Sequence, residues 1–224
     1  MKKIVIDPRV IKHLGRDLIT SPEVAVIELV KNSIDAKAKH INLRLYNNYS
    51  HYESLPNYVR AAIPKQYLDL PMLIVEDDGR GMTNAALDDG FLKIATDIKT
   101  NEEGTLGEKG IGRLATQRLG TALLVETSSV EESQTSYVFI DWNDVINGVE
   151  EVPNFEGPAT PHHTRLIIFN VNLEDYIDNA MQFEQLSLDN SNVQVQINRE
   201  LKSALNFLIS PFDNSKETLP IPQL

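Results

Sequence analysis

The sequence predicts an α+β fold, a two-layer sandwich in which a mixed sheet is covered on one side by helices. Apolar residues recur at helical spacing in residues 22–38. They alternate with polar residues in 40–46, and they form a continuous run at the start of 71–82. Both kinds of signal occur along one chain without an internal repeat, so helices and strands are expected to share a core.

The bulk properties are those of a globular domain. The chain has 224 residues, and 42% of them are hydrophobic, which is enough to build a real core. We therefore expect one large domain, or one domain with part of another. The sequence shows no obvious end to the domain at its C-terminus, and we interpret it as a fragment of a longer protein.

Charge and residue usage argue against several classes of protein. The formal net charge of −11 does not support nucleic-acid binding by counterion release. Cysteine is absent, so neither a disulfide framework nor a thiolate zinc site can form. The apolar run at the start is too short for a signal peptide, and no stretch approaches a membrane span, so a cytoplasmic location without membrane contact is expected.

The first half of the predicted fold begins with two helices. Residues 8–19 are typical of a short helix that opens with a proline. A second helix starts after Ser21, which can serve as its N-cap, because Pro22 suits the first helical position. The strand at 40–46 follows. Residues 47–70, rich in tyrosine, proline and asparagine, are interpreted as an insertion with about one helical turn.

The second half is predicted to alternate strands, helices and loops. A helix around 83–90 precedes a long loop over 95–113, and this loop holds four of the chain's eleven glycines. Long loops inside compact domains tend to be functional. The remaining predicted elements are a helix at 111–119, strands at 121–129 and 135–142 that form a hairpin, a loop at 147–163, a strand at 164–171, mainly helical structure at 173–210 and a short strand in the tail 210–224.

The second helix carries an unusual row of polar side chains. Glu28, Asn32 and Asp35 fall at i, i+4 and i+7, which stacks them along one face. Such a row can simply be a solvated helix face. In a functional interpretation, Glu28 orients a water as general base, and Asn32 offers a neutral oxygen to Mg²⁺, which favours hard oxygen ligands. Asp35 could tether either group.

An acidic turn punctuated by glycine follows the buried strand. In "EDDGRGM", Asp77 stands at the carboxyl end of the strand, where it can accept a hydrogen bond from an exocyclic amine such as that of adenine. Gly79 and Gly81 would let the backbone approach a flat ring closely. The alternative is an ordinary tight turn, since turns are rich in Asp and Gly.

The third motif, "GEKGIGRLA", opens a helix. Its Gly107-x-x-Gly110-x-Gly112 spacing is neither a P-loop nor a Rossmann fingerprint. Free backbone N–H groups at a helix N-terminus nevertheless form an anion site, to which Lys109 and Arg113 could add positive charge. The alternative is a flexible loop followed by a helix cap.

Together and in this order, the three motifs resemble those of the GHKL ATPases. This superfamily includes the heat-shock chaperones of the ninety-kilodalton class, MutL and MORC proteins, type II topoisomerases and histidine kinases. "ELVKNSIDA" resembles the N-box, "DDGRGM" the adenine-reading motif and "GEKGIG" the ATP-lid motif, over roughly residues 9–171. The resemblance implies a Bergerat fold with a mostly antiparallel sheet that holds ATP and Mg²⁺ between helices and sheet.

The resemblance also implies a role for individual residues. Glu28 would activate the attacking water, Asn32 would bind Mg²⁺, and Asp77 would bond the adenine amine. The residues implied to complete the nucleotide site are Asp35 on the helix, Gly79, Gly81 and Met82 beside the ring, Thr164 near the adenine aspartate, and Lys99, Gly107, Lys109, Gly110, Ile111 and Gly112 in the lid around the triphosphate, with Thr96 as a weaker candidate. The Thr164 match is loose, because "HHT" replaces the family's more usual glycine.

The branch of the superfamily is interpreted from two positions. Glu28 is present as a hydrolytic base, and Asp35 stands where histidine kinases usually carry lysine, so the resemblance favours a bacterial, hydrolytic, Hsp90-like or MORC-like ATPase. It implies binding of ATP and ADP, slow Mg²⁺-dependent hydrolysis, and nucleotide-driven dimer closure acting on a further domain or client. A non-hydrolysing scaffold or sensor is the alternative, and histidine phosphotransfer is less favoured.

We expect the whole chain, 1–224, to be a single ATP-binding domain. Its core would span about 9–171, and 172–224 would form a helical extension with a possible last strand.

Two adjacent histidines and three aromatic residues are assigned to structure. His162 and His163 would point to opposite faces of a strand, so joint metal binding is not expected. Phe139, Trp142 and Phe169 are predicted to be core residues rather than stacking platforms.

Overall fold

The computed structural model describes residues 2–3, 22–51, 54–92, 112–171 and 194–197. The predicted helix at 8–19, most of the 95–113 loop and the predicted tail strand lie outside these residues. Among the described residues, no helix is long and apolar enough to cross a membrane.

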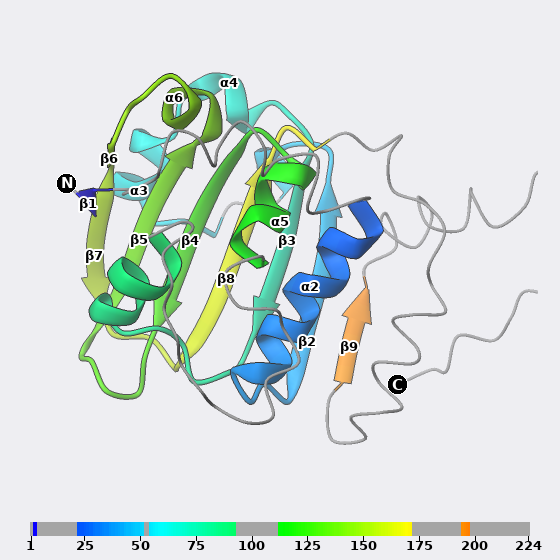
Figure 1. The fold of residues 1–224 in the computed structure, drawn as a ribbon, viewed down its shortest axis with the longest axis vertical. Helices are drawn as coiled ribbons and strands as arrows, with labels where there is room; N and C mark the ends of the chain where they lie inside the picture. The colour runs from blue at the N-terminus through cyan, green and yellow to red at the C-terminus, as the bar shows by residue number, and fades with distance from the viewer. Residues whose placement is uncertain (1, 4–21, 52–53, 93–111, 172–193, 198–224) are drawn as a thin grey trace, which may run out of the picture.

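A seven-stranded sheet forms the centre of the structure (Figure 1). Its strands run in the order β7-β5-β4-β8-β3-β2-β9, and all neighbours are antiparallel except β2 and β9. The strands are β2 (His40–Tyr46), β3 (Met72–Asp77), β4 (Ala122–Ser128), β5 (Gln134–Asp141), β7 (Asn154–Pro158), β8 (His163–Phe169) and β9 (Gln194–Ile197). A separate two-stranded sheet pairs β1 (Lys2–Lys3) with β6 (Glu151–Val152).

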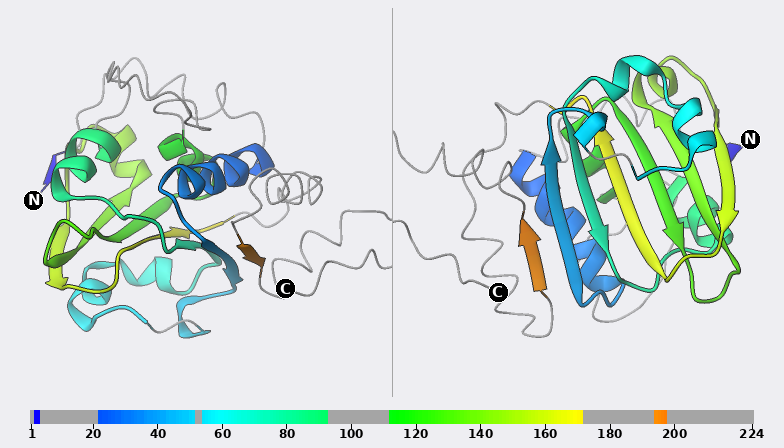
Figure 2. Two further views of the ribbon diagram at one scale, coloured as in Figure 1. Left: turned by 90° about the horizontal axis from the view of Figure 1, so that it is seen from below. Right: turned by 180° about the vertical axis from the view of Figure 1, so that it is seen from behind.

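The longer helices cover one face of this sheet, here called the helix face (Figures 1 and 2). They are α2 (Pro22–Asp35) and α5 (Gly112–Leu119), which pack against each other, with a π-helical segment η2 (Ala86–Leu92) and the short α6 (Trp142–Ile146). The predicted apolar stripe of α2 is buried there, with Ile27, Val30 and Ile34 at most 8% exposed. Alternate residues of the strands supply the other half of this core.

The short helices of the 47–70 segment cover the opposite face, here called the back face (Figure 2). These are η1 (Tyr49–His51), α3 (Asn57–Ala62) and α4 (Lys65–Leu68), more helix than the single turn expected. Tyr67 of α4 packs its ring against Phe139 and Phe169, with centroids 5.9 and 6.2 Å apart. The segment therefore covers a second hydrophobic core, which is rich in aromatic side chains.

The fold class predicted from the sequence is confirmed, and so are the helix at 22–35 and the central strands. The helix predicted around 83–90 is present, and the two strands expected to form a hairpin pair as β4 and β5. Phe139, Trp142 and Phe169 are core residues, each at most 3% exposed. The expectation of helices on one side holds for α2 and α5, while α3 and α4 lie on the back face.

Three local predictions were wrong. The expected loop at 147–163 contains β6 and β7, because the weakly patterned "NFEGP" gains its backbone hydrogen bonds by pairing with β5. Within the range 173–210, which was expected to be mainly helical, the structure describes only 194–197, and these residues form the strand β9. Their sequence "QVQI" alternates as a strand does and pairs with β2. Trp142 begins α6 instead of ending a strand, since Asp141 caps that helix by accepting from the Asn143 N–H.

The back-face core gives a first test. Phe169 is fully buried and contacts the rings of Tyr67 and Phe139. We expect Phe169→Ala to lower the free energy of unfolding by about 3–5 kcal/mol, because it leaves a cavity in a packed core. Urea denaturation measures this loss. Val130→Ala, at a position 67% exposed, should change it by less than about 0.5 kcal/mol, and a similar value for both variants would contradict the assignment.

Candidate active site

The site centres on Asp77, at the end of β3 under the carboxyl-terminal half of α2. Its side chain lies on the helix face and the residue is 6% exposed. Ser33 of α2 donates its hydroxyl hydrogen to Oδ2 at 2.8 Å, and the Gly79 N–H donates to Oδ1 at 2.9 Å. An ionised carboxylate has about four lone-pair positions, so each oxygen keeps one for a further donor.

Burial governs the charge state of this carboxyl. Removal from water raises the pKa of Asp77 above its ordinary value, and the hydrogen bonds from Ser33 and Gly79 pull it part of the way back. Nearby Asp78 raises it further and His163 lowers it by smaller amounts. Asp77 is therefore a carboxyl whose ionisation depends on a few identifiable donors.

The turn after β3 is fixed to α2 and β4 by its glycines. A Cβ at Gly79 would lie 2.8 Å from Oδ1 of Asp77 and 2.9 Å from Cβ of Ala36. Gly81 has φ of +68°, and a Cβ there would lie 2.0 Å from the carbonyl oxygen of Ser128. The two glycines let this turn approach the end of α2 and the end of β4 more closely than any side chain would allow.

Two threonines continue the site across the sheet. Thr164 on β8 is directly opposite Asp77, and Thr127 on β4 is directly opposite Thr164. Thr127 Oγ1 donates to the His163 carbonyl at 3.0 Å and accepts from the Met82 N–H at 2.8 Å. The structure thus brings Asp77, the glycine turn, Met82 and Thr164 together.

The polar row on α2 runs alongside this centre. Asn32 is exposed and precedes Ser33, which contacts Asp77 directly. Glu28 lies one turn before Asn32, about 6 Å away along the helix axis. Lys31 donates to Glu28 Oε1 at 2.6 Å, and the Glu28 side chain is 13% exposed. Asp35 is half-buried at the end of the helix.

Of the residues in the predicted ATP lid, 95–113, the structure describes only those from Gly112 on. Gly112 begins α5, as predicted, and α5 packs against α2 beside the site. The other residues expected to contact phosphate lie outside the described residues: Thr96, Lys99, Gly107, Lys109, Gly110 and Ile111.

The two histidines make different contacts: His162 lies just before β8, and His163 is its first residue. His162 Nδ1 donates to the Gly79 carbonyl at 2.7 Å, which ties the glycine turn to β8. His163 faces acceptors with both nitrogens, Pro161 O at 2.8 Å and Glu126 Oε1 at 3.1 Å. The described residues contain no group of three or more His, Cys, Asp or Glu side chains placed to hold a metal ion.

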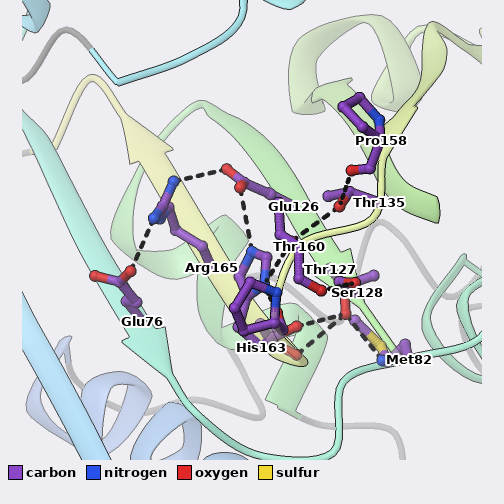
Figure 3. Close-up of polar contacts among 12 residues, drawn as sticks. Glu76, Met82, Glu126, Thr127, Ser128, Thr135, Pro158, Thr160, His163 and Arg165 are labelled. Atoms are coloured by element: carbon purple, nitrogen blue, oxygen red, sulfur yellow. Dashed lines mark hydrogen bonds and ion pairs between the residues drawn. The ribbon is translucent and has the colours of Figure 1, made fainter. Parts of the chain in front are cut away.

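A row of charges crosses the back face behind the site (Figure 3). Arg165 on β8 donates to Glu76 on β3 at 2.8 Å and to Glu126 on β4 at 2.9 Å, and Arg44 on β2 also pairs with Glu76. Glu76 precedes Asp77, Glu126 precedes Thr127, and Arg165 follows Thr164. The row therefore holds in register the strand ends that carry the site.

Sequence reasoning missed several of these residues. Ser33 lies inside the "ELVKNSIDA" motif, and its spacing from Ile34 and Val30 could have marked it as inward-facing. Thr127 and the back-face charges carry no local signal, because their contacts join residues 32 to 89 positions apart.

Comparison with known proteins identifies the family. A family model described as "Histidine kinase-, DNA gyrase B-, and HSP90-like ATPase" matches residues 19–165, which is more than half of the chain. The chain belongs to this ATPase family. The match includes the α2 row, Asp77, the glycine turn, the lid motif and Thr164, and it confirms the resemblance to the GHKL superfamily.

Other comparisons are more distant. One similar solved structure is titled "Crystal Structure of N terminal domain of a DNA repair protein", with 17% sequence identity and a TM-score of 0.48. The alignment covers 84% of this chain and 51% of that one, so this chain spans about half the length of that structure. No curated protein matches the chain.

The glycine turn can be tested through stability. Gly81→Ala forces a side chain into a left-handed conformation and against the Ser128 carbonyl. We expect it to lower the free energy of unfolding by about 1–3 kcal/mol from backbone strain alone. Gly90→Ala is the matched control, because a Cβ there has no atom within 4 Å, and it should be neutral or stabilising by up to about 1 kcal/mol. Equal effects in chemical denaturation would refute the constraint at Gly81.

Proposed function

We propose that this domain binds ATP with Mg²⁺ and hydrolyses it slowly, and that this cycle drives conformational change or dimer closure in a larger protein. Membership of the ATPase family supports nucleotide binding. The observation that carries the proposal is Asp77, a buried carboxylate held by Ser33 and Gly79 with lone pairs left for a third donor.

The arrangement fits the adenine base. An ionised carboxylate only accepts hydrogen bonds, so it selects a ring with an exocyclic amine over a ring with a carbonyl at the same position. The close approaches at Gly79 and Gly81 keep side-chain bulk away from the turn beside that carboxylate. Asp77 would read the amine, while Gly79, Gly81, Met82 and Thr164 would line the ring.

The α2 row fits the phosphate end of the nucleotide. Asn32 presents an exposed amide oxygen, a ligand type that Mg²⁺ accepts alongside phosphate oxygens and waters. Bound Mg²⁺ would neutralise phosphate charge. Asp35 would orient neighbouring groups. The triphosphate would be wrapped by the lid residues Lys99, Gly107, Lys109, Gly110, Ile111 and Gly112.

Glu28 would act as the general base. Lys31 holds Oε1 at 2.6 Å, which fixes the carboxylate and leaves Oε2 as the oxygen through which Glu28 would take a proton from water. The same contact favours the second candidate, a non-hydrolysing nucleotide-binding scaffold, because Oε1 of Glu28 is already engaged by Lys31. Within the hydrolytic class, the sequences of the motifs are most similar to those of Hsp90-like or MORC-like proteins.

Adenine recognition is tested by Asp77→Asn. The change keeps the shape of the side chain and removes its charge, so we expect ATP affinity to fall by about 1.5–3 kcal/mol, the scale of a hydrogen bond to a charged group. Calorimetric titration of the chain measures it. The matched control is Asp69→Asn, an exposed carboxylate after α4 on the back face, which should leave affinity unchanged. Unchanged affinity in Asp77→Asn would remove the adenine role.

Hydrolysis is tested by Glu28→Ala. If Glu28 is the base, turnover should fall by roughly 10²–10⁴-fold while ATP binding is retained. Steady-state phosphate release measures turnover, and Glu131→Ala, an exposed carboxylate in the β4–β5 turn, serves as control. A wild-type chain that binds ATP but releases no phosphate would favour the scaffold. Measurable turnover that survives in Glu28→Ala would exclude Glu28 as the base.

A further inference from the structure

Ser33 is a buried polar side chain to which the sequence motifs assign no role. It lies on α2 and is 3% exposed. Its Oγ is 2.8 Å from Asp77 Oδ2 and 3.4 Å from the Leu29 carbonyl oxygen one turn earlier. A hydroxyl has one hydrogen to donate. The shorter contact is to a potentially charged acceptor, so the hydrogen is directed to Asp77 and the contact to Leu29 is secondary.

The bond from Ser33 completes a two-point support of the carboxyl group. Gly79 holds Oδ1 from the turn, and Ser33 holds Oδ2 from the helix. Both supports donate, and both therefore suit the ionised carboxylate. The Gly79 N–H is a backbone group present with any residue there, whereas the donor at Oδ2 depends on the side chain at position 33.

We propose that Ser33 is the positioning residue that sets base specificity at this site, because its hydroxyl keeps Asp77 an ionised hydrogen-bond acceptor for a ring amine. This inference rests on the proposed nucleotide binding. A protonated Asp77 would carry an O–H donor, which could pair with a ring carbonyl. The charge state of one carboxyl then decides between a base with an amine at C6 and a base with a carbonyl at C6.

The electrostatic surroundings support this role. Burial raises the pKa of Asp77, and the Ser33 hydrogen bond is the largest of the influences that lower it. The other groups acting on it are the Gly79 N–H, Asp78 on the same turn, which raises the pKa, and His163 on β8, which lowers it. Facing Asp77, α2 offers the neutral Ser33, and β8 offers the neutral Thr164, the register partner of Asp77. Thr164 in turn lies 3.3 Å from the neutral Thr127 of β4.

The direction of the pH effect follows. Nucleotide binding through an ionised Asp77 is complete above the pKa of that carboxyl in the free protein and is lost as pH falls through it. Removing the Ser33 donor raises this pKa further. The loss of ATP binding must therefore begin at a higher pH in a variant that lacks the hydroxyl.

The test compares ATP with inosine triphosphate, which has a carbonyl in place of the amine at C6. Dissociation constants of both are measured for the wild-type chain and for Ser33→Ala over a pH series from about 5 to about 8. In Ser33→Ala we expect ATP to bind roughly three- to tenfold more weakly near neutral pH. The preference for ATP over inosine triphosphate should shrink, and the acid loss of ATP binding should shift to higher pH.

Two further variants make the result specific. Ser136→Ala removes an equally buried hydroxyl, one that donates to the Asn84 side chain, and it should leave both the preference and the pH profile unchanged. Ser33→Cys keeps the volume with a weaker donor and should shift both quantities in the same direction as Ser33→Ala. It replaces Ser33→Ala if the alanine variant does not fold.

A measurement without nucleotide separates this inference from the proposed function. The titration of the Asp77 carboxyl carbon, followed by NMR in the free chain, should move to higher pH in the Ser33 variant. If the wild type binds neither nucleotide, the proposed function fails, and an unshifted titration would then also overturn the role of Ser33. If the wild type prefers ATP but the Ser33 variant keeps its preference, pH profile and Asp77 titration, the inference alone is wrong.

Discussion

The site depends on the close packing of the end of α2 against the end of β3. The Ser33 hydroxyl bonds Asp77, Arg80 N–H bonds the Ala36 carbonyl at 2.9 Å, and Gly79 has no Cβ to hold the helix away. These contacts bring the helix that carries Glu28 and Asn32 next to a strand-end carboxylate. Without this close packing, the residues proposed to read the base and to bind Mg²⁺ would lie on unconnected elements.

The remainder of the fold supports that junction. Apolar residues of α2 and alternate strand residues bury the helix face, while the 47–70 segment buries the aromatic back face. The charges around Arg165 keep β3, β8 and β4 in register behind the site, since a shift of one residue would turn Asp77 and Thr164 to the wrong face. Breaking such a row by removing one partner is costly, because it leaves half-buried charges uncompensated.

Sequence reasoning was most successful where a local pattern in the chain determines the structure. The row on α2 and the Asp77 turn are short motifs, and strands such as β3 are long apolar runs, so both could be predicted from neighbours in the chain. Ser33, Thr127 and Arg165 form hydrogen bonds with residues 36 to 89 positions away in the sequence. The spacing of residues along the chain does not reveal such distant partners. The strand β7 was missed because its stability comes from pairing with β5 rather than from its own composition.

We propose that a buried, ionised Asp77 makes this domain an adenine-nucleotide site. Calorimetric titration of the chain with ATP, ADP and GTP, each with and without Mg²⁺, tests it most directly. The account predicts binding of ATP and ADP, little or no binding of GTP, and tighter ATP binding with Mg²⁺. Equal binding of ATP and GTP, or no binding of any of the three nucleotides, would contradict it.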